Sequence, residues 1–365
     1  MRVAIVAPSL RILGGQAVQA DRLLRAWQGD PDIRAWLVPV NPAPRWARPA
    51  LRIKYVRTVV TQLCYWPLLV KAIRRADVVH VFSASYTSFL LAPLPAVLVA
   101  RLFGRPVVMN YRSGEAPDHL RRSGVARMTL RRVDRNAVPS AFLKDVFGAH
   151  GIHAEVIPNI VDTERFRFRR RERFGPAVLS TRNFEALYDV GCTLRAFRLI
   201  QDRFPDATLT LVGSGSGEMS LRELAKRLQL RHVTFAGRVP PEDIWRYYAD
   251  ADIYLQTPAI DNMPSSVLEA FASGCAVVST NAGGVPAILT HEVQGLLATC
   301  GDHADVAKAV CRLIEDPALA SRLTAAALDS CQQYRWSNVR ARWVTLYESL
   351  MERVDAVTQP RPSAI

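Results

Sequence analysis

The chain has 365 residues, of which 49% are hydrophobic and 22% are charged, and its formal net charge is +14. This length argues against a single core and favours two globular domains of ordinary composition. Six cysteines are spread along the chain without any Cys-x-x-Cys pair. That spacing favours reduced thiols in a cytosolic protein over a disulfide framework or a zinc site.

The positive charge is concentrated in the first half of the chain. From Met1 to Arg173, 29 Lys and Arg stand against 12 Asp and Glu, a balance of +17, and the remainder has 18 against 21, a balance of −3. Such an excess indicates an anionic partner: an anionic membrane surface, a phosphorylated substrate or nucleic acid. An arginine-rich coding bias, which would raise the count without any partner, is an equal alternative.

The first part of the chain alternates short apolar runs with helical patterns. Strands are predicted at 2–8, 76–82 and 106–111, and helices at 17–28 and 88–103. Strands that alternate with helices favour a parallel sheet. The apolar start is short and contains Pro8, so it predicts a buried strand rather than a signal peptide. The uncharged run Val78–Ala100 has the length of a membrane span, but its polar residues and prolines favour a strand, a turn and a buried helix.

The same alternation restarts after a densely charged segment at 165–174, which is interpreted as a linker between domains. Strands are predicted at 177–180, 207–213, 232–237, 252–257 and 275–280. Helices are predicted at 192–204 and 219–230.

The predicted fold class is therefore α/β, with two Rossmann-like domains whose parallel sheets face an interdomain cleft. The first domain is expected at 1–165 and the second at 166–344. A C-terminal helix at about 345–357 is expected to pack back on the first domain, and 358–365 to form a disordered tail. Ligands of such folds bind in the cleft, at the carboxyl ends of the strands.

Two acids, Asp261 and Glu269, flank a proline in the stretch Asp261–Gly274. Pro264 suits the first position of a helix, where its missing N–H costs nothing. The N–H groups of Ser265 and Ser266 then lie at a helix N-terminus, which favours an anion, and Glu269 lies one turn further along the same face. The pattern predicts a diphosphate at the helix tip with a carboxylate near its ribose. The alternative is a capped helix with an exposed glutamate.

The two acids are not expected to form a hydrolytic pair. If the whole stretch were helical, the eight residues between them would span about 12 Å. The two carboxylates of glycosidases lie closer together than that. Pro264 instead makes Asp261 a loop residue and Glu269 a helix residue.

Glycines follow several predicted strands. Gly14 and Gly15 follow the first strand, where a side chain would block a phosphate. Residues 213–217 read Gly-Ser-Gly-Ser-Gly, which does not fit the G-x-G-x-x-G of dinucleotide-binding proteins. Gly283 and Gly284 are predicted to form a tight turn that faces the cleft, with a simple structural turn as the alternative.

Several short motifs occur in a characteristic order along the chain. They are Gly14–Gly15, Val156–Phe166, Ser180–Arg182, Leu211–Gly217, Val233–Val239, Leu268–Thr280 and Asn281–Gly284. In this order and spacing the chain resembles the retaining GT-B glycosyltransferases of family 4, also called group 1. The resemblance covers nearly the whole chain and is strongest from Val178 to Leu297.

The resemblance implies a role for each matching residue. Glu269 would bind the ribose hydroxyls of a nucleotide sugar, Asp261 would face the donor sugar, and Arg182 would bind the diphosphate. Gly14 and Gly15 would let the backbone approach the diphosphate and the sugar. The other donor-binding residues expected are Gly213, Gly237, Arg238, Ser265, Ser266, Gly283 and Gly284.

The chain also departs from the family's pattern. Residues 183–191 contain no lysine, although relatives often have one shortly after the phosphate-binding arginine. Asp261 stands where relatives have a glutamate. Ala287 stands at a second position where relatives often have a glutamate. Arg112 stands near the place of a family histidine and is expected to contact phosphate or acceptor. With Asp261 and Arg182 it makes up the expected catalytic residues. The alternative is that Arg112 is a surface residue. His119 is the other candidate for the histidine's place.

The resemblance implies transfer of a sugar, with retention, from a UDP- or GDP-sugar to a saccharide or lipid-linked acceptor in cell-surface polysaccharide or glycoconjugate synthesis. Neither a metal nor another cofactor is expected, because Arg182 and backbone N–H groups can stabilise the leaving diphosphate. The basic first half predicts a cytoplasmic protein that contacts the inner face of the plasma membrane. The alternative is a non-catalytic GT-B protein that binds a nucleotide sugar or a protein partner. Nucleic acid is not expected as a partner, although Phe and Arg interleave at 165–174.

Overall fold

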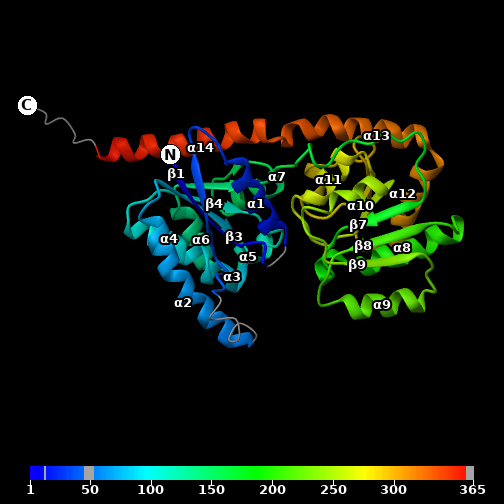
Figure 1. Cartoon of the computed structure of the whole chain (residues 1–365), viewed down its shortest axis with the longest axis horizontal. Coiled ribbons are helices and arrows are strands. Elements are labelled where there is room, and N and C mark those ends of the chain that lie inside the picture. Colours follow the sequence, from blue (N-terminus) through cyan, green and yellow to red (C-terminus); the bar gives the residue numbers. More distant parts are fainter. Residues whose placement is uncertain (12–13, 45–52, 359–365) are drawn as a thin grey trace, which may run out of the picture. The chain divides into compact units, whose positions relative to one another are not determined.

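The computed structural model describes residues 1–11, 14–44 and 53–358. The chain divides into two units (Figure 1): the first holds Met1–Pro158 and the chain from Val339 onward, and the second holds Asn159–Asn338. The division thus falls at residue 158, where the sequence predicted a boundary at 165. The predicted tail lies, apart from Thr358, outside the described residues. Each unit is described below by itself.

The first unit is built on a six-stranded parallel sheet with the strand order β2-β1-β3-β4-β5-β6. Its strands are β1 (Arg2–Ala7), β2 (Arg34–Pro39), β3 (Val78–Ser83), β4 (Val107–Tyr111), β5 (Arg135–Val138) and β6 (Glu155–Val156). β3 is buried along its whole length and β1 along all but its first residue, as expected for strands covered on both faces. The three strands predicted in this part of the chain are confirmed, and β2, β5 and β6 were not predicted.

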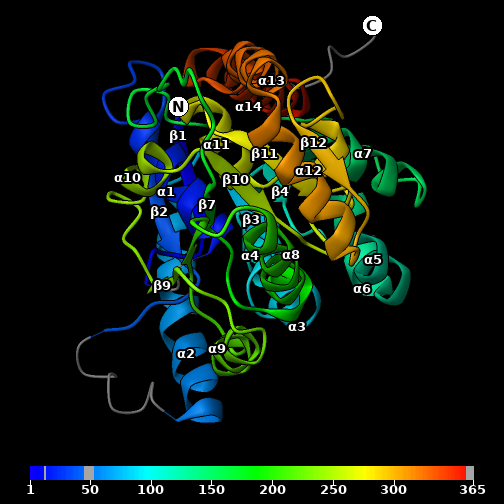
Figure 2. The same ribbon diagram turned by 90° about the vertical axis from the view of Figure 1, so that its right-hand side faces the viewer.

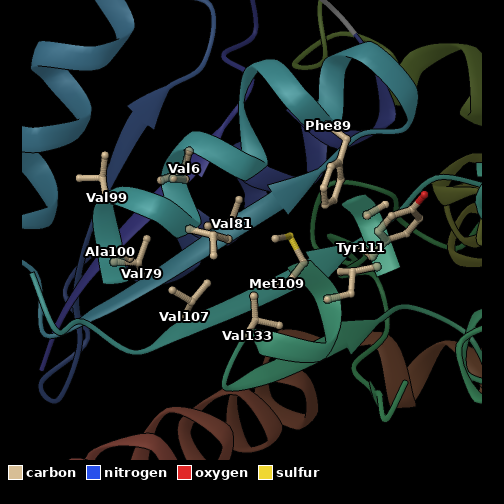
Figure 3. Packing of buried hydrophobic residues seen from close by; sticks show 14 of the residues in the cluster. Val6, Val79, Val81, Phe89, Val99, Ala100, Val107, Met109, Tyr111 and Val133 are labelled. Atoms are coloured by element: carbon tan, nitrogen blue, oxygen red, sulfur yellow. The ribbon is translucent and has the colours of Figure 1, made fainter. Parts of the chain in front are cut away.

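Helices cover both faces of this sheet (Figures 1 and 2). They are α1 (Gly15–Ala26), α2 (Lys54–Ile73), α3 (Tyr86–Leu91), α4 (Pro93–Leu102), α5 (Ala116–Arg122), α6 (Gly124–Arg132) and α7 (Ala141–Gly148). Side chains of β3 and β4 pack against those of α3 and α4 in the core shown in Figure 3, which includes Val79, Val81, Phe89, Val99, Val107 and Met109. The uncharged run Val78–Ala100 therefore forms a strand and two short helices. None of the helices described for this chain has the length and apolar character needed to cross a membrane.

The last helix, α14 (Trp336–Thr358), packs on the first unit from Val339 onward. Tyr347 is buried, and its hydroxyl lies 2.6 Å from Nδ1 of His80 in β3. Nε of Arg340 donates to Oδ2 of Asp30 at 2.6 Å. Apolar and charged contacts thus both hold α14 to this unit.

The second unit repeats the design with a parallel sheet of order β12-β11-β10-β7-β8-β9. Its strands are β7 (Ala177–Ser180), β8 (Thr208–Val212), β9 (Val233–Gly237), β10 (Ile253–Gln256), β11 (Ala276–Thr280) and β12 (Leu296–Ala298). Its helices are α8 (Val190–Arg203), α9 (Glu218–Arg227), α10 (Trp245–Asp250), α11 (Ser265–Ser273), α12 (His303–Glu315) and α13 (Pro317–Ser330), with short 3-10 turns at η3 (Ala186–Tyr188), η4 (Val285–Ala287) and η5 (Cys331–Tyr334). All the strands predicted for this half of the chain are confirmed.

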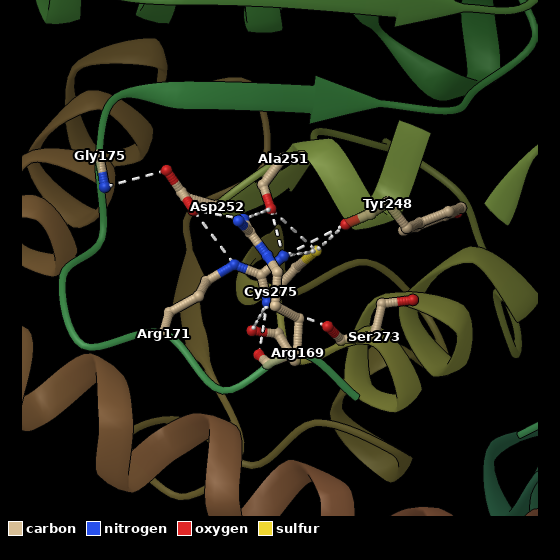
Figure 4. Close-up of polar contacts among 9 residues, drawn as sticks. Arg169, Arg171, Gly175, Tyr248, Ala251, Asp252, Ser273 and Cys275 are labelled. Carbon is tan, nitrogen blue, oxygen red and sulfur yellow. Dashed lines mark hydrogen bonds and ion pairs between the residues drawn. The ribbon is translucent and has the colours of Figure 1, made fainter. Parts of the chain in front are cut away.

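The basic segment at 165–174 is part of the second unit. Figure 4 shows Arg171 of this segment among the ends of two helices. Its guanidinium donates to the carbonyl oxygens of Tyr248 and Ala251 at the end of α10, and of Ser273 and Gly274 at the end of α11. It also pairs with Asp252 at 3.1 Å. The interpretation of the segment as a linker between domains is therefore wrong for Arg171, which is buried and satisfies carbonyls that a helix leaves unpaired at its C-terminus.

Candidate functional site

The predicted residues of the second unit lie where its strands end. β7, β8, β10 and β11 are parallel, so their carboxyl ends lie at one edge of the sheet. Arg182 follows β7, Gly213 follows β8, Asp261 follows β10 after a short loop, and Gly283 follows β11. This is the edge at which ligands of parallel α/β sheets bind.

Arg182 and Asp261 form an ion pair at this edge. Nη2 of Arg182 lies 2.6 Å from Oδ2 of Asp261, and Nη1 donates to Oγ of Ser266 at 3.2 Å. Oδ1 of Asp261 accepts from the backbone N–H of Asn262 at 2.9 Å. One arginine therefore joins the end of β7 to the loop after β10 and to the first turn of α11.

The guanidinium of Arg182 is enclosed and strongly basic. It lies over the ring of Tyr188, with 4.0 Å between Cζ and the ring centroid. Burial acts to lower the pKa of Arg182, but the Asp261 carboxylate and the neighbouring tyrosines together outweigh it and raise that pKa above its usual value. Among the described residues, Nε of Arg182 is buried without a hydrogen-bond partner. A permanently charged guanidinium with an unused donor is suited to a phosphate, whose oxygens accept hydrogen bonds in pairs.

The N-terminus of α11 lies beside this arginine. The helix begins at Ser265, and Pro264 occupies the N-cap position just before it, which corrects the predicted position by one residue. The first N–H groups of any helix lack an intrahelical acceptor. The first turn of this described helix contains no acidic side chain, so its tip favours an anion.

Asn159 supports the helix tip, and sequence reasoning missed it. Its Nδ2 donates to the carbonyl oxygen of Met263 at 2.7 Å and to Oγ of Ser265 at 3.4 Å. The side chain is buried. A polar residue within the otherwise apolar stretch Val156–Val161 was the available signal, because buried amides need hydrogen-bond partners.

Glu269 lies on α11, one turn beyond Ser265, and only 7% of its surface is exposed. The alternative of an exposed glutamate on a capped helix is therefore wrong. Burial, and after it the Glu269 carboxylate, raises the pKa of Tyr248 well above its usual value. The hydroxyl of Tyr248 lies 2.7 Å from Oγ1 of Thr181, the residue before Arg182. Glu269 and Arg182 thus belong to one enclosed polar cluster.

Two of the predicted glycines are required by close backbone contacts. Gly213 has φ +158°, and a Cβ there would lie 2.2 Å from the carbonyl oxygen of Arg182. A Cβ on Gly284 would lie 2.3 Å from the carbonyl oxygen of Asn262, and the N–H of Gly284 donates to the carbonyl of Asp261 at 3.2 Å. These glycines let neighbouring loops pack directly against Arg182 and Asp261.

The segment that lacks the family's lysine makes other contacts. Glu185 accepts from the backbone N–H of Ser216 at 3.0 Å and from its hydroxyl at 2.7 Å, which ties the segment to the glycine-rich loop after β8. The N–H of Gly213 in that loop donates to the carbonyl of Gly237 at 2.9 Å. Arg238, the next residue, is exposed. Gly237 therefore positions the loop, and Arg238 has a side chain that solvent can reach.

The first unit contributes Gly14 and Gly15 at the start of α1, after β1. Gly14 is extended, with φ −172°, and Gly15 is the first helical residue. Among the residues that the structure describes, a Cβ added to either would meet no atom within 4 Å. Beside them, Nε2 of Gln16 donates to the carbonyl of Ser83, at the end of β3, at 3.0 Å. The backbone of this turn is thus open to a ligand.

Arg112 follows β4 and is half-buried. Its Nη1 donates to Oδ1 of Asn110 at 3.2 Å, and its guanidinium lies 5.3 Å from the ring centroid of Phe82. Burial lowers the pKa of Arg112 to about 9. Within the described part of the chain its Nη2 is buried and unpartnered. The structure therefore leaves Arg112 with an unused donor.

Two further positions bear on the comparison with the family's pattern, His119 and Ala287. His119 is buried, with Nδ1 2.7 Å from the hydroxyl of Tyr111 and its pKa lowered by burial. It is a core residue of the first unit and does not take the place of the family histidine. Ala287 lies exposed in η4.

Comparisons with known proteins place both units in one family. The profile "Glycosyl transferases group 1" matches residues 163–329, and "Glycosyltransferase Family 4" matches residues 13–165. The chain belongs to the group 1 glycosyltransferases. The resemblance seen in its motifs is therefore confirmed.

Relatives of this group 1 glycosyltransferase include two enzymes from distant organisms. Sulfoquinovosyl transferase SQD2 of Arabidopsis thaliana is 25% identical over 77% of the chain and 59% of its own length. The GDP-mannose-dependent alpha-(1-6)-phosphatidylinositol monomannoside mannosyltransferase of Mycobacterium tuberculosis is 30% identical over 62% of the chain and 64% of its own length. The chain thus matches less than two thirds of the length of each relative.

Solved structures share the fold of this group 1 glycosyltransferase. Anabaena HepE in complex with UDP and glucose has a TM-score of 0.75 at 19% identity, over 96% of this chain and 100% of that one. Sucrose-phosphate synthase from Thermosynechococcus elongatus has a TM-score of 0.77 at 17% identity, over 96% of this chain and 99% of that one. These likenesses confirm the predicted GT-B fold class, with its two parallel α/β sheets.

Proposed function

We propose that the chain transfers a sugar from a UDP- or GDP-sugar to a saccharide or lipid-linked acceptor. Family membership supports the class of reaction. HepE binds UDP-glucose in one of its structures, and the mycobacterial relative is named for GDP-mannose and a phosphatidylinositol mannoside. The observation that carries the proposal is the contact of Arg182 with Asp261 and Ser266 at the tip of α11.

In the proposed reaction, negative charge grows on the diphosphate as its bond to the sugar breaks. Arg182 and the N–H groups at the start of α11 stabilise that charge, because they are fixed before the reaction begins. Glu269 accepts hydrogen bonds from the ribose hydroxyls. Asp261 faces the donor sugar, and its ion pair with Arg182 holds it beside the diphosphate.

We further propose retention of the anomeric configuration and independence of metal ions. Retention follows from the family's chemistry, with attack and departure on one face of the sugar. Metal independence is supported by the positive charge that Arg182 and the α11 tip supply. Product anomers resolved by NMR test the first point. Unchanged turnover in EDTA tests the second.

The cellular role that we propose is synthesis of a surface polysaccharide or glycoconjugate by a cytoplasmic protein bound peripherally to the plasma membrane. The lipid acceptor in the name of the mycobacterial relative supports it. So does the net charge of +17 in the first half of the chain.

Nucleotide release from a panel of UDP- and GDP-sugars, with and without lipid extracts as acceptors, tests the proposed transfer. We expect release with one donor class and none from the variant Arg182→Ala. Absence of both turnover and nucleotide binding with every donor would reject the proposal.

A second candidate function is that of a non-catalytic GT-B protein which binds a nucleotide sugar or a protein partner. The absence of lysine from residues 183–191 and the aspartate at 261 favour it. It predicts that Glu269→Ala leaves cellular function unchanged, whereas the transferase loses it.

A further inference from the structure

Helix α2 (Lys54–Ile73) has an apolar side that is not buried in the first unit. Tyr65, Leu69 and Ile73 are fully buried and attach the helix to the core. The hydroxyl of Tyr65 donates to the carbonyl of Ala92 at 3.0 Å, at the start of α4. α2 and α4 therefore lie side by side at the edge of this unit (Figures 1 and 2).

The exposed side of α2 carries a continuous apolar stripe. Val59, Leu63 and Trp66 are 59%, 69% and 42% exposed, and the half-buried Val70 extends the series. Spacings of four, three and four residues place these side chains on one face of a helix. Large exposed apolar patches of this kind mark a surface that another apolar body covers.

Basic residues border the stripe at its carboxyl end. Lys71, Arg74 and Arg75 line a surface groove of about 820 Å³ together with Trp66, Pro67 and Val70. The sequence contains nine Lys and Arg and neither Asp nor Glu between Asp32 and Asp77. The apolar stripe is thus joined to positive charge that acidic neighbours in the sequence do not cancel.

We infer that the exposed face of α2 docks on a bilayer surface that contains anionic lipids. A helix that lies in the membrane interface combines aliphatic and tryptophan side chains on one face with flanking cations. The cations are attracted to anionic headgroups, and the stripe enters the boundary with the acyl chains. Two copies of this face would repel each other through like charges, and aliphatic side chains offer nothing to the phosphates of nucleic acid. The inference rests on the proposed function, because a transferase that uses a lipid-linked acceptor must reach the membrane that contains the acceptor.

Sedimentation of the full chain with phosphatidylcholine vesicles, with and without phosphatidylglycerol, tests the inference. We expect partitioning at least about tenfold stronger with the anionic lipid, because each cation near such a surface contributes about 1 kcal/mol. At about 1 M NaCl, where the screening length is about 3 Å, a residual fraction should stay bound through the stripe.

Two pairs of variants separate the apolar and the basic contributions. Leu63→Ser with Trp66→Ser should abolish the salt-resistant fraction, whereas Met219→Ser, at an exposed position on α9, should not. Lys71→Glu with Arg75→Glu should reduce anionic-vesicle binding more than about tenfold. The matched reversal Lys226→Glu with Arg227→Glu, at the exposed end of α9, should leave that binding unchanged.

Three outcomes would overturn the inference. The first is equal binding of the chain to neutral and anionic vesicles. The second is vesicle binding by the α2 variants that equals that of the unmodified chain. The third is a dimer, seen in sedimentation velocity, that the double variant Leu63→Ser with Trp66→Ser abolishes. The vesicle assay uses no donor, so its failure leaves the transferase proposal standing. Stabilisation by nucleotide sugars, measured on the same α2 variants, should be unchanged and shows that they are folded.

Discussion

Arg182 has partners in three separate segments: Asp261, Ser266 and the ring of Tyr188. These contacts fix its guanidinium before any ligand arrives. Asp261 is one methylene shorter than the family's glutamate, and it points to the arginine at 2.6 Å. At this position, therefore, the acid proposed to face the sugar is paired directly with the cation proposed to bind the phosphate.

The identity of these residues could be predicted, but their contacts could not. Arg182, Asp261 and Ser266 each belong to a short motif that can be read along the sequence. Arg182 and Asp261 are 79 positions apart, and their meeting depends on the order of β7 and β10 in the sheet. Asn159 was missed because its function is to hold a loop more than a hundred residues away.

The glycines of the two units should respond differently to alanine. Gly213→Ala forces a Cβ against the carbonyl of Arg182 and should lower the free energy of unfolding by about 2 to 3 kcal/mol. Gly14→Ala meets open space and an extended backbone, so stability should change by less than about 0.5 kcal/mol. Urea unfolding of both variants measures this. Equal stability of the two would contradict the close contact at Gly213.

Among the elements of the second unit, α10 and α11 are joined at their carboxyl ends by Arg171. Arg171→Met keeps much of the apolar stem but removes the hydrogen bonds to four carbonyl oxygens and the ion pair with Asp252. We expect a loss of about 3 kcal/mol in the free energy of unfolding. The neighbouring Arg170→Met, at an exposed position, is the matched control and should be nearly neutral. A neutral effect of Arg171→Met in urea unfolding would show that these bonds contribute little.

The contact between β3 and α14 should make the first unit sensitive to acid. Burial, and after it the charge of Arg112, lowers the pKa of His80 to about 3, against about 6.5 in an unfolded chain. Between these values only the unfolded state binds the proton. Stability should therefore fall as the pH drops below 6.5, by about 1.4 kcal/mol per pH unit from this group.

Urea unfolding between about pH 7.5 and pH 4.5 measures this effect. His80→Gln should reduce the slope of stability against pH by about one proton. His153→Gln, at an exposed position, is the control and should keep the slope. An unchanged slope in His80→Gln would mean that His80 becomes protonated without unfolding.

Strands that are buried on both faces were predicted well, and other elements were missed for physical reasons. β1, β3 and β4 are continuous apolar runs and could be recognised directly. α2 was missed because apolar residues lie on both its buried and its exposed side, which hides the helical period. The stripe that obscured the pattern is the one proposed to meet the membrane.

For the whole molecule, charge and fold carry separate information. The alternation of strands and helices predicted the two α/β domains, whereas the place of the division depended on tertiary contacts such as that of Asn159 with Met263. The excess of positive charge lies in the first half of the chain, where three cations at and just after the end of α2 lie beside its apolar stripe.

The central claim is that the cluster of Arg182, Asp261 and the α11 tip binds the diphosphate of a nucleotide sugar. Calorimetric titration of UDP, GDP and their sugars into the unmodified chain and into Arg182→Ala tests it most directly. We predict binding of one nucleotide class by the unmodified chain and a loss of at least about 2 kcal/mol, or some thirtyfold in affinity, in Arg182→Ala. Equal affinity of the two proteins, or no binding of any nucleotide, would contradict it.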